Sequence, residues 1–264
     1  MKIRPAAVAG MFYPADRVQL AQEVRAMLAA AKDGTLHPKA LIAPHAGYIY
    51  SGPVAASAYA LLAPMARQIH RVVLLGPAHR VALRGLALPD AAAFDTPLGR
   101  VEIDLAAVRQ IIHMPQVVVS AAAHAQEHSL EVQLPFLQNL LPAFKLLPLA
   151  VGEASAEEVR EVLDILWGGP ETLILISSDL SHYLPYPAAK QADRITADAI
   201  LHLQAPVSHE QACGGTAVNG LILVAQGRGL VAHLLDLRNS GDTTGPRDQV
   251  VGYGAFAFTE PCHA

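Results

Sequence analysis

The chain has 264 residues, of which 52% are hydrophobic and 16% are charged, and its formal net charge is −4. A weakly acidic chain without a Lys/Arg run argues against a nucleic-acid partner, and its two cysteines, Cys213 and Cys262, are too few for a disulfide framework. The sequence contains no unbroken run of about 18 apolar residues, the length that a membrane-spanning helix needs. We therefore expect a protein of the reducing cytoplasm, with neither a membrane nor a nucleic acid as partner.

The segment at residues 1–16, MKIRPAAVAGMFYPAD, joins a basic start to a short apolar stretch. The stretch lies between Pro5 and Pro14 and lacks a convincing cleavage site, unlike a secretory signal. We interpret this segment as part of the fold.

Beyond residue 16 the sequence alternates between helical and strand patterns. Helical periodicity and end signals predict helices at residues 17–32, 52–63, 104–113, 131–141, 155–168, 187–203 and 214–226. Apolar runs predict strands at residues 40–44, 71–77, 116–120, 144–152, 171–179, 230–238 and 250–258, with shorter strands in 83–104. The alternation predicts one α/β domain over residues 1–264, a three-layer αβα sandwich. The closing pair of strands indicates a mixed, largely parallel sheet.

Three histidines share one position relative to the buried strands. His45 follows the strand at 40–44, His79 follows 71–77, and His182 follows 171–179. Ligands of open α/β sheets bind beyond the carboxyl ends of parallel strands. Each histidine alone reads as an ordinary loop residue, but the threefold repetition favours a shared site at one end of the sheet.

Cys213 precedes two glycines and a predicted helix. A thiol at a helix N-terminus has a lowered pKa, because the free N–H groups stabilise the thiolate. The alternative is a buried, inert cysteine. Imidazoles together with a thiolate form a credible ligand set for iron, copper or zinc.

The stretch HAQEHSLE places His124 and His128 four residues apart, the spacing of two ligands on one helix face. Ser129, however, resembles a cap before the helix at residue 131. We therefore expect His124 to lie in the preceding loop.

The motifs APHAGYIYSG, LLGPAHR, EHSLEVQLPFL, SSDLSHY and CGG occur in the order found in the Memo family, whose bacterial members are called AmmeMemoRadiSam system protein B. The resemblance runs from AGMFYP near the start to VVGYGAFAF near the end. It implies a single Memo-like domain with a fold similar to class III extradiol dioxygenases. In those enzymes two histidines and a carboxylate hold iron(II), and another histidine acts as acid/base.

The resemblance also implies roles for individual residues. His45 and His79 match metal ligands, and Cys213 stands where the dioxygenases have their carboxylate. His182 matches the acid/base histidine, and Asp179 matches the acidic residue of the SSD motif. A thiolate is a softer donor than a carboxylate and favours copper(I), zinc or a differently tuned iron. Ring cleavage of simple diols therefore does not follow from the fold.

Four further residues match the motifs. We expect His128 to line the cleft as a supporting or substrate-facing group, with Glu127 or Glu131 orienting a neighbour. The alternative is a network that only holds the helix start. Tyr48 is a candidate hydrogen-bond donor to substrate, and its alternative is packing beside the turn.

Two classes of function follow. The first is a metal-dependent oxidoreductase with iron(II) or copper, or with zinc as a third choice. The second is a non-catalytic component that binds a metal, a peptide or a small ligand, in a system with radical-SAM and AMMECR1-like proteins, as the resemblance implies. A vestigial site without metal is a third reading, and the sequence leaves the oligomeric state open.

Overall fold

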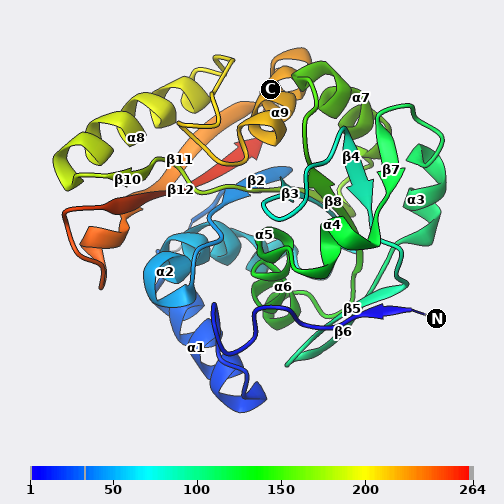
Figure 1. Ribbon diagram of the computed structural model, residues 1–264, viewed down its shortest axis with the longest axis horizontal. Coiled ribbons are helices and arrows are strands. Elements are labelled where there is room, and N and C mark those ends of the chain that lie inside the picture. Colours follow the sequence, from blue (N-terminus) through cyan, green and yellow to red (C-terminus); the bar gives the residue numbers. More distant parts are fainter. Residues whose placement is uncertain (1, 33, 262–264) are drawn as a thin grey trace.

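The computed structural model describes residues 2–32 and 34–261, so Cys262 lies outside the described residues. Within them, nine strands form one sheet that runs through the molecule (Figure 1). Its strands follow the spatial order β10-β12-β2-β9-β3-β8-β4-β7, and β11 pairs with β12. The strands are β2 (Ala40–Ala43), β3 (Arg71–Pro77), β4 (Leu86–Leu88), β7 (Val117–Val119), β8 (Lys145–Val151), β9 (Thr172–Ser177), β10 (His182–Leu184), β11 (Val231–Asn239) and β12 (Val250–Thr259).

The centre of this sheet is parallel and its margins are mixed. Strands β2, β9, β3 and β8 are parallel neighbours. Strand β12 runs antiparallel to β2 on one side, and β4 runs antiparallel to β8 on the other. The predicted mixed sheet with a parallel core is therefore confirmed.

Both faces of the sheet are buried, which explains why the central strands read as continuous apolar runs. Successive side chains of a strand point to opposite faces. In β3, Val72 and Leu74 pack into one core, whereas Val73 and Leu75 pack into the other.

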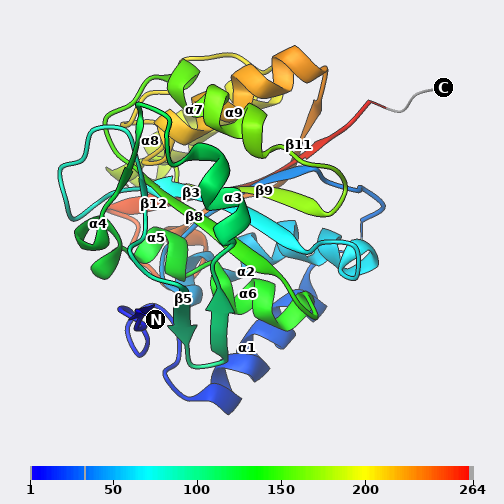
Figure 2. The ribbon, with the colours of Figure 1, turned by 90° about the vertical axis from the view of Figure 1, so that its right-hand side faces the viewer.

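Helices cover each face and complete the three predicted layers, as two views at right angles agree (Figures 1 and 2). One face carries α1 (Arg17–Ala30), α2 (Tyr48–Tyr59) and α6 (Leu134–Leu140). The other carries α3 (Leu105–Ile111), α7 (Ala156–Leu166), α8 (Tyr186–Leu201) and α9 (Gly215–Arg228). None of the helices in the described part of the chain is both long and apolar enough to cross a bilayer.

Smaller elements fill in the periphery. Short helices α4 (Ala121–Ala125) and α5 (His128–Glu131) precede α6, and 3₁₀ turns follow α2 (Ala60–Met65) and β11 (Ser240–Asp242). A separate small sheet joins β1 (Ile3–Arg4), β5 (Ala93–Thr96) and β6 (Gly99–Glu102).

Most predicted helices agree with the structure to within about two residues at each end, but two differ by more. The helix expected at residues 131–141 is divided into α5 and α6, because Pro135 suits the first turn of a new helix and not the interior of a continuous one. The helix expected at 52–63 begins earlier, at Tyr48, so Pro53 lies inside it. The missing Pro53 N–H would have met the carbonyl of Ile49, a residue that is 65% exposed and open to water.

Candidate metal centre

The carboxyl ends of three parallel strands meet at one end of the sheet. Strand β9 lies between β2 and β3 and is parallel to both. His45 and His79 each follow the end of their strand by two residues, and His182 begins β10 shortly after β9. The expected convergence of the three strand ends is therefore confirmed.

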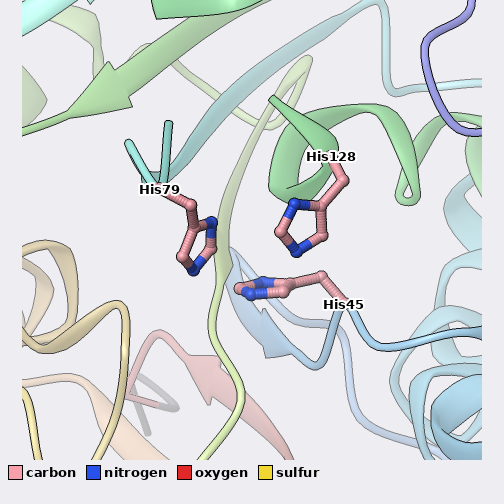
Figure 3. Close-up of side chains that lie close together, drawn as sticks. All are labelled: His45, His79 and His128. Atoms are coloured by element: carbon pink, nitrogen blue, oxygen red, sulfur yellow. The ribbon is translucent and has the colours of Figure 1, made fainter. Parts of the chain in front are cut away.

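His45, His79 and His128 form a compact cluster at this end. One ring nitrogen from each lies within 4.8 Å of the other two, and Figure 3 shows the three rings facing one another. The ring centroids of His45 lie 5.3 Å from those of His79 and His128, which are 4.6 Å apart. This spacing suits a single ion, and it makes His128 an equal member of the cluster where the sequence indicated a supporting one.

Glu127 holds His79 in place. Its carboxylate accepts the His79 backbone N–H at 2.6 Å and contacts His79 Nδ1 at 2.9 Å. A carboxylate only accepts, so Nδ1 carries a proton and Nε2 is the nitrogen left to face a ligand. Burial opposes ionisation of Glu127, but the hydrogen bonds from His79 and Ser129 lower its pKa to about 2. The expected orienting carboxylate is thus Glu127.

Burial keeps two rings of the cluster, those of His45 and His128, in the neutral form. Burial and the neighbouring histidines lower the pKa of His45 well below its ordinary value. Burial lowers the pKa of His128 to about 4, and its buried Nδ1 has no hydrogen-bond partner among the described residues. Because a neutral imidazole carries a lone pair, rings in this state are ready to bind a cation.

Cys213 lies directly beside the cluster. Its Sγ is 3.4 Å from His45 Nε2, close to the separation of about 3.5 Å that sulfur and nitrogen ligands have around one tetrahedral ion. The expected lowering of its pKa is wrong for the metal-free thiol: burial and the Asp179 carboxylate raise the pKa to about 12. The sulfur accepts the backbone N–H of Asp179 at 3.3 Å.

Asp179 supports the turn after β2. Its carboxylate accepts the backbone N–H of His45 at 2.8 Å, and no hydrogen bond within the described ranges joins it to His182. Burial raises the pKa of Asp179 to about 7, against the opposing effect of that backbone contact. Asp179 therefore positions the backbone of His45.

Two pockets are lined in part by residues of the cluster. One, of about 720 Å³, is lined in part by His79 and Cys213. The other, of about 350 Å³, is the size of a small organic molecule, and its lining includes Phe12, Tyr50, His128, Asp179, His182 and Tyr253. Burial lowers the pKa of His182, so a neutral ring faces this pocket.

Glu131 and Tyr48 both have structural contacts. Glu131 is fully buried and accepts hydrogen bonds from Arg4, from the backbone of Ala7 and Val8, and from Tyr13. The Tyr48 hydroxyl is buried and donates to the carbonyl of Val132 at 2.7 Å. Both residues therefore match the structural alternative left open by the sequence.

The expected loop position of His124 and the expected capping role of Ser129 are both wrong. His124 lies in α4 and not in a loop, and its Nε2 contacts the carbonyl of Ala87 at 2.8 Å. The cap of α5 is Glu127, whose carboxylate accepts the Ser129 N–H, so the helix begins at His128. A break between α4 and α5 separates the two histidines that shared helical spacing.

Sequence reasoning did not single out Ser177 or Gln133. The Ser177 hydroxyl lies 2.8 Å from His45 Nδ1, and the Gln133 amide donates to that hydroxyl at 2.7 Å. Ser177 ends a buried strand beside Asp179, which was the available signal. Gln133 lies in an apolar helical pattern, and a single amide in such a pattern gives no sequence signal for a site.

Comparisons with known proteins agree with the motif resemblance. A family model described as "Memo-like protein" matches residues 4–257. The chain is 36% identical over 273 residues to a "MEMO1 family protein" of Aquifex aeolicus, covering 98% of this chain and 100% of that one. It is 37% identical over 268 residues to one of Archaeoglobus fulgidus, covering 95% and 97%. Among solved structures, uncharacterized protein JW3007 from Escherichia coli K12 aligns with a TM-score of 0.48 and 13% identity, covering 81% of this chain and 98% of that one.

Proposed function

This chain belongs to the Memo-like protein family, and from that premise we propose that it binds one metal ion on His45, His79 and His128, with the Cys213 thiol as an adjacent soft donor. The observation that carries the proposal is the meeting of three imidazoles from three separate elements, with ring nitrogens within 4.8 Å. His45 is buried and His128 half-buried, and the pKa of each is lowered, so these two rings carry free lone pairs, which favours a ligand role.

The donor set supports iron(II), copper or zinc in preference to magnesium or calcium. Imidazole nitrogen and thiolate sulfur suit these softer ions, whereas magnesium and calcium prefer oxygen. Because the pKa of the free Cys213 thiol is raised to about 12, this residue joins the ligand set only when an ion displaces its proton.

We propose that the function is that of a metal-dependent oxidoreductase acting on a small organic ligand in the pocket of about 350 Å³. Iron or copper held by the cluster would supply the redox chemistry. His182, neutral and in the pocket wall, is placed to accept or return a proton of the bound ligand. The aromatic side chains around the pocket would exclude water from that ligand.

The second candidate is a non-catalytic binding component that cooperates with radical-SAM and AMMECR1-like proteins. The observation that favours it is Cys213 itself, since a thiol occupies the place where a redox dioxygenase would carry a carboxylate. A zinc ion held by three imidazoles and a thiolate would have a closed tetrahedral shell, as in structural sites.

Metal analysis of untagged protein purified without air tests the proposal. We expect one bound ion in the parent protein and its loss in His45→Ala and His128→Ala. Bound iron or copper with oxygen consumption would support the oxidoreductase, whereas zinc without redox change would support the binding component. A parent protein that takes up no ion when titrated with iron(II), copper(I) and zinc would overturn both.

A further inference from the structure

Three buried polar side chains outside the histidine cluster form a continuous hydrogen-bond chain that ends on His45. The Tyr59 hydroxyl donates to Gln133 Oε1 at 2.5 Å, Gln133 Nε2 donates to Ser177 Oγ at 2.7 Å, and Ser177 Oγ lies 2.8 Å from His45 Nδ1. Tyr59, Gln133 and Ser177 are all 0% exposed. We call this chain of Tyr59, Gln133 and Ser177 the relay. Fully buried polar groups are costly unless every one is paired, so the relay specifies one arrangement of its hydrogen bonds.

Two backbone carbonyls set the direction of every proton in the relay. Gln133 Nε2 lies 3.0 Å from the carbonyl oxygen of Pro44, and only an amino group can face an oxygen that accepts. The Gln133 oxygen must therefore face Tyr59, and the remaining N–H points at Ser177. Ser177 in turn donates its own proton to the carbonyl of Ser129 at 2.6 Å.

These directions leave one choice for His45. A serine hydroxyl has one proton and accepts on its oxygen lone pairs. The Ser177 proton is committed to Ser129, so the contact with His45 forms only if Nδ1 carries a proton and donates it. The neutral ring then has its lone pair on Nε2, the nitrogen that faces Cys213 Sγ at 3.4 Å.

We propose that Tyr59, Gln133 and Ser177 are positioning residues that lock His45 in the Nδ1–H tautomer and thereby present the Nε2 lone pair to the ion. This inference rests on the ion site proposed above. In the opposite tautomer Nδ1 and Ser177 Oγ would face each other without a proton, and Nε2–H would point at Cys213. The relay removes that competing state before any ion arrives.

The relay fixes the tautomer of His45, as the Glu127 carboxylate fixes that of His79. Glu127 fixes the His79 tautomer with a charge, whereas a neutral hydroxyl fixes that of His45. A carboxylate at position 177 would lie close to Asp179, which is already buried, and two buried like charges repel. A neutral relay orients the ring without that cost.

Nitrogen-15 NMR of histidine-labelled, metal-free protein at neutral pH measures the tautomer directly. The chain has 12 histidines, and the His45 signals are assigned by their absence in His45→Gln. The parent is expected to carry the His45 proton on Nδ1. Ser177→Ala should shift it partly or wholly to Nε2, and Ser177→Thr, which keeps the hydroxyl, should restore the parent pattern.

Zinc affinity supplies the second measurement. Ser177→Ala is expected to lower the affinity about 10–100-fold, the usual consequence of losing the partner of a ligating histidine, and Gln133→Met should lower it less. The matched control is Ser51→Ala, since Ser51 is 1% exposed and its hydroxyl donates to the carbonyl of Ala46 at 2.9 Å and not to a histidine ring. Its affinity and tautomer should equal those of the parent.

Two results would overturn the inference: a His45 proton on Nε2 in the metal-free parent, or a Ser177→Ala protein that matches Ser51→Ala in both measurements. The proposed ion site fails separately, if the parent binds no metal, because the tautomer is read without one. If Ser177→Ala does not fold, Gln133→Met carries the same comparison.

Discussion

His128 follows His124 by only four residues, yet the two rings have different surroundings. His128 joins the cluster, whereas His124 is tied to the carbonyl of Ala87 in α4. We predict that His128→Ala lowers zinc affinity by at least about 100-fold, the upper end of what loss of a supporting contact costs. His124→Ala should lower the thermal stability but keep the affinity. Competitive zinc titration with a melting curve of each variant measures both, and equal affinity losses would remove His128 from the ligand set.

Tyr183 adopts a left-handed backbone conformation next to His182. Its φ is +59°, and its side chain is 70% exposed. This conformation costs a residue with a Cβ about 1–2 kcal/mol, and Asn adopts it more readily. Tyr183→Asn is therefore expected to raise the free energy of unfolding by about 0.5–1 kcal/mol in a urea titration. Ile49→Asn, at an exposed helical position, should bring no gain. A loss of stability in Tyr183→Asn would mean that the tyrosine ring packs usefully despite its exposure.

The residues of the site differ in how far the sequence could predict them. His45 and His79 follow buried strands, and that local pattern places them once the strands are parallel neighbours. The role of His128 depended on the break between α4 and α5, which is set by the buried carboxylate of Glu127. The raised pKa of Cys213 follows from burial beside Asp179, and the orientation of Gln133 follows from the carbonyl of Pro44; both are tertiary contacts without a local sequence signal.

At the scale of elements, Asp104 joins the start of α3 to β3. Its carboxylate caps the helix through Ala106 and Ala107 and pairs with Arg71 at 2.7 Å. Burial opposes ionisation, but the hydrogen bonds from Ala107 and Arg71 lower the pKa of Asp104. A carboxyl whose pKa is lower in the folded state stabilises the fold above its unfolded pKa of about 3.9, and this is lost as the pH falls through the folded value.

We predict that Asp104→Ala lowers the free energy of unfolding at pH 7 by about 1–2 kcal/mol. Asp104→Asn, which keeps a capping oxygen, should lose less. The difference between the parent and Asp104→Asn should shrink as the pH falls below about 4. Urea titrations at pH 7 and pH 3 measure it, and a difference independent of pH would exclude a contribution from the charge.

A buried ion pair fastens the N-terminal segment to α5. Arg4 pairs with Glu131 and also donates to the carbonyls of His124 and Glu127. Removing one partner leaves the other charge buried and unpaired, so Arg4→Met is expected to cost about 3–5 kcal/mol. Adding Glu131→Gln to it should cost much less than the sum of the two single changes. Additive losses in this double-mutant cycle would show that the two side chains act independently.

At the scale of the whole molecule, the three-layer sandwich could be predicted because its strands are buried on both faces and alternate with helices. The start of α5 could not, since Glu127, whose carboxylate caps it, is held by the distant backbone of His79. The pairing of β10 with β12 was also missed, because a three-residue strand carries too little periodicity. In each case the deciding contact joins residues that are far apart in the sequence.

The proposed ion would connect segments that are distant in the chain: the turns after β2 and β3 and the start of α5. A ligand that binds only the folded state stabilises it by mass action, by about 4 kcal/mol at a free concentration of 1,000 times the Kd. For a chain of this size that corresponds to a rise in Tm of roughly 8–16 °C. We predict such a rise when chelator-treated protein is reloaded with zinc, and no rise in His45→Ala. Calorimetry of the two proteins with and without zinc makes the comparison. An unchanged Tm for the parent would mean that the folded protein does not bind zinc selectively, and the imidazoles would then need a different partner.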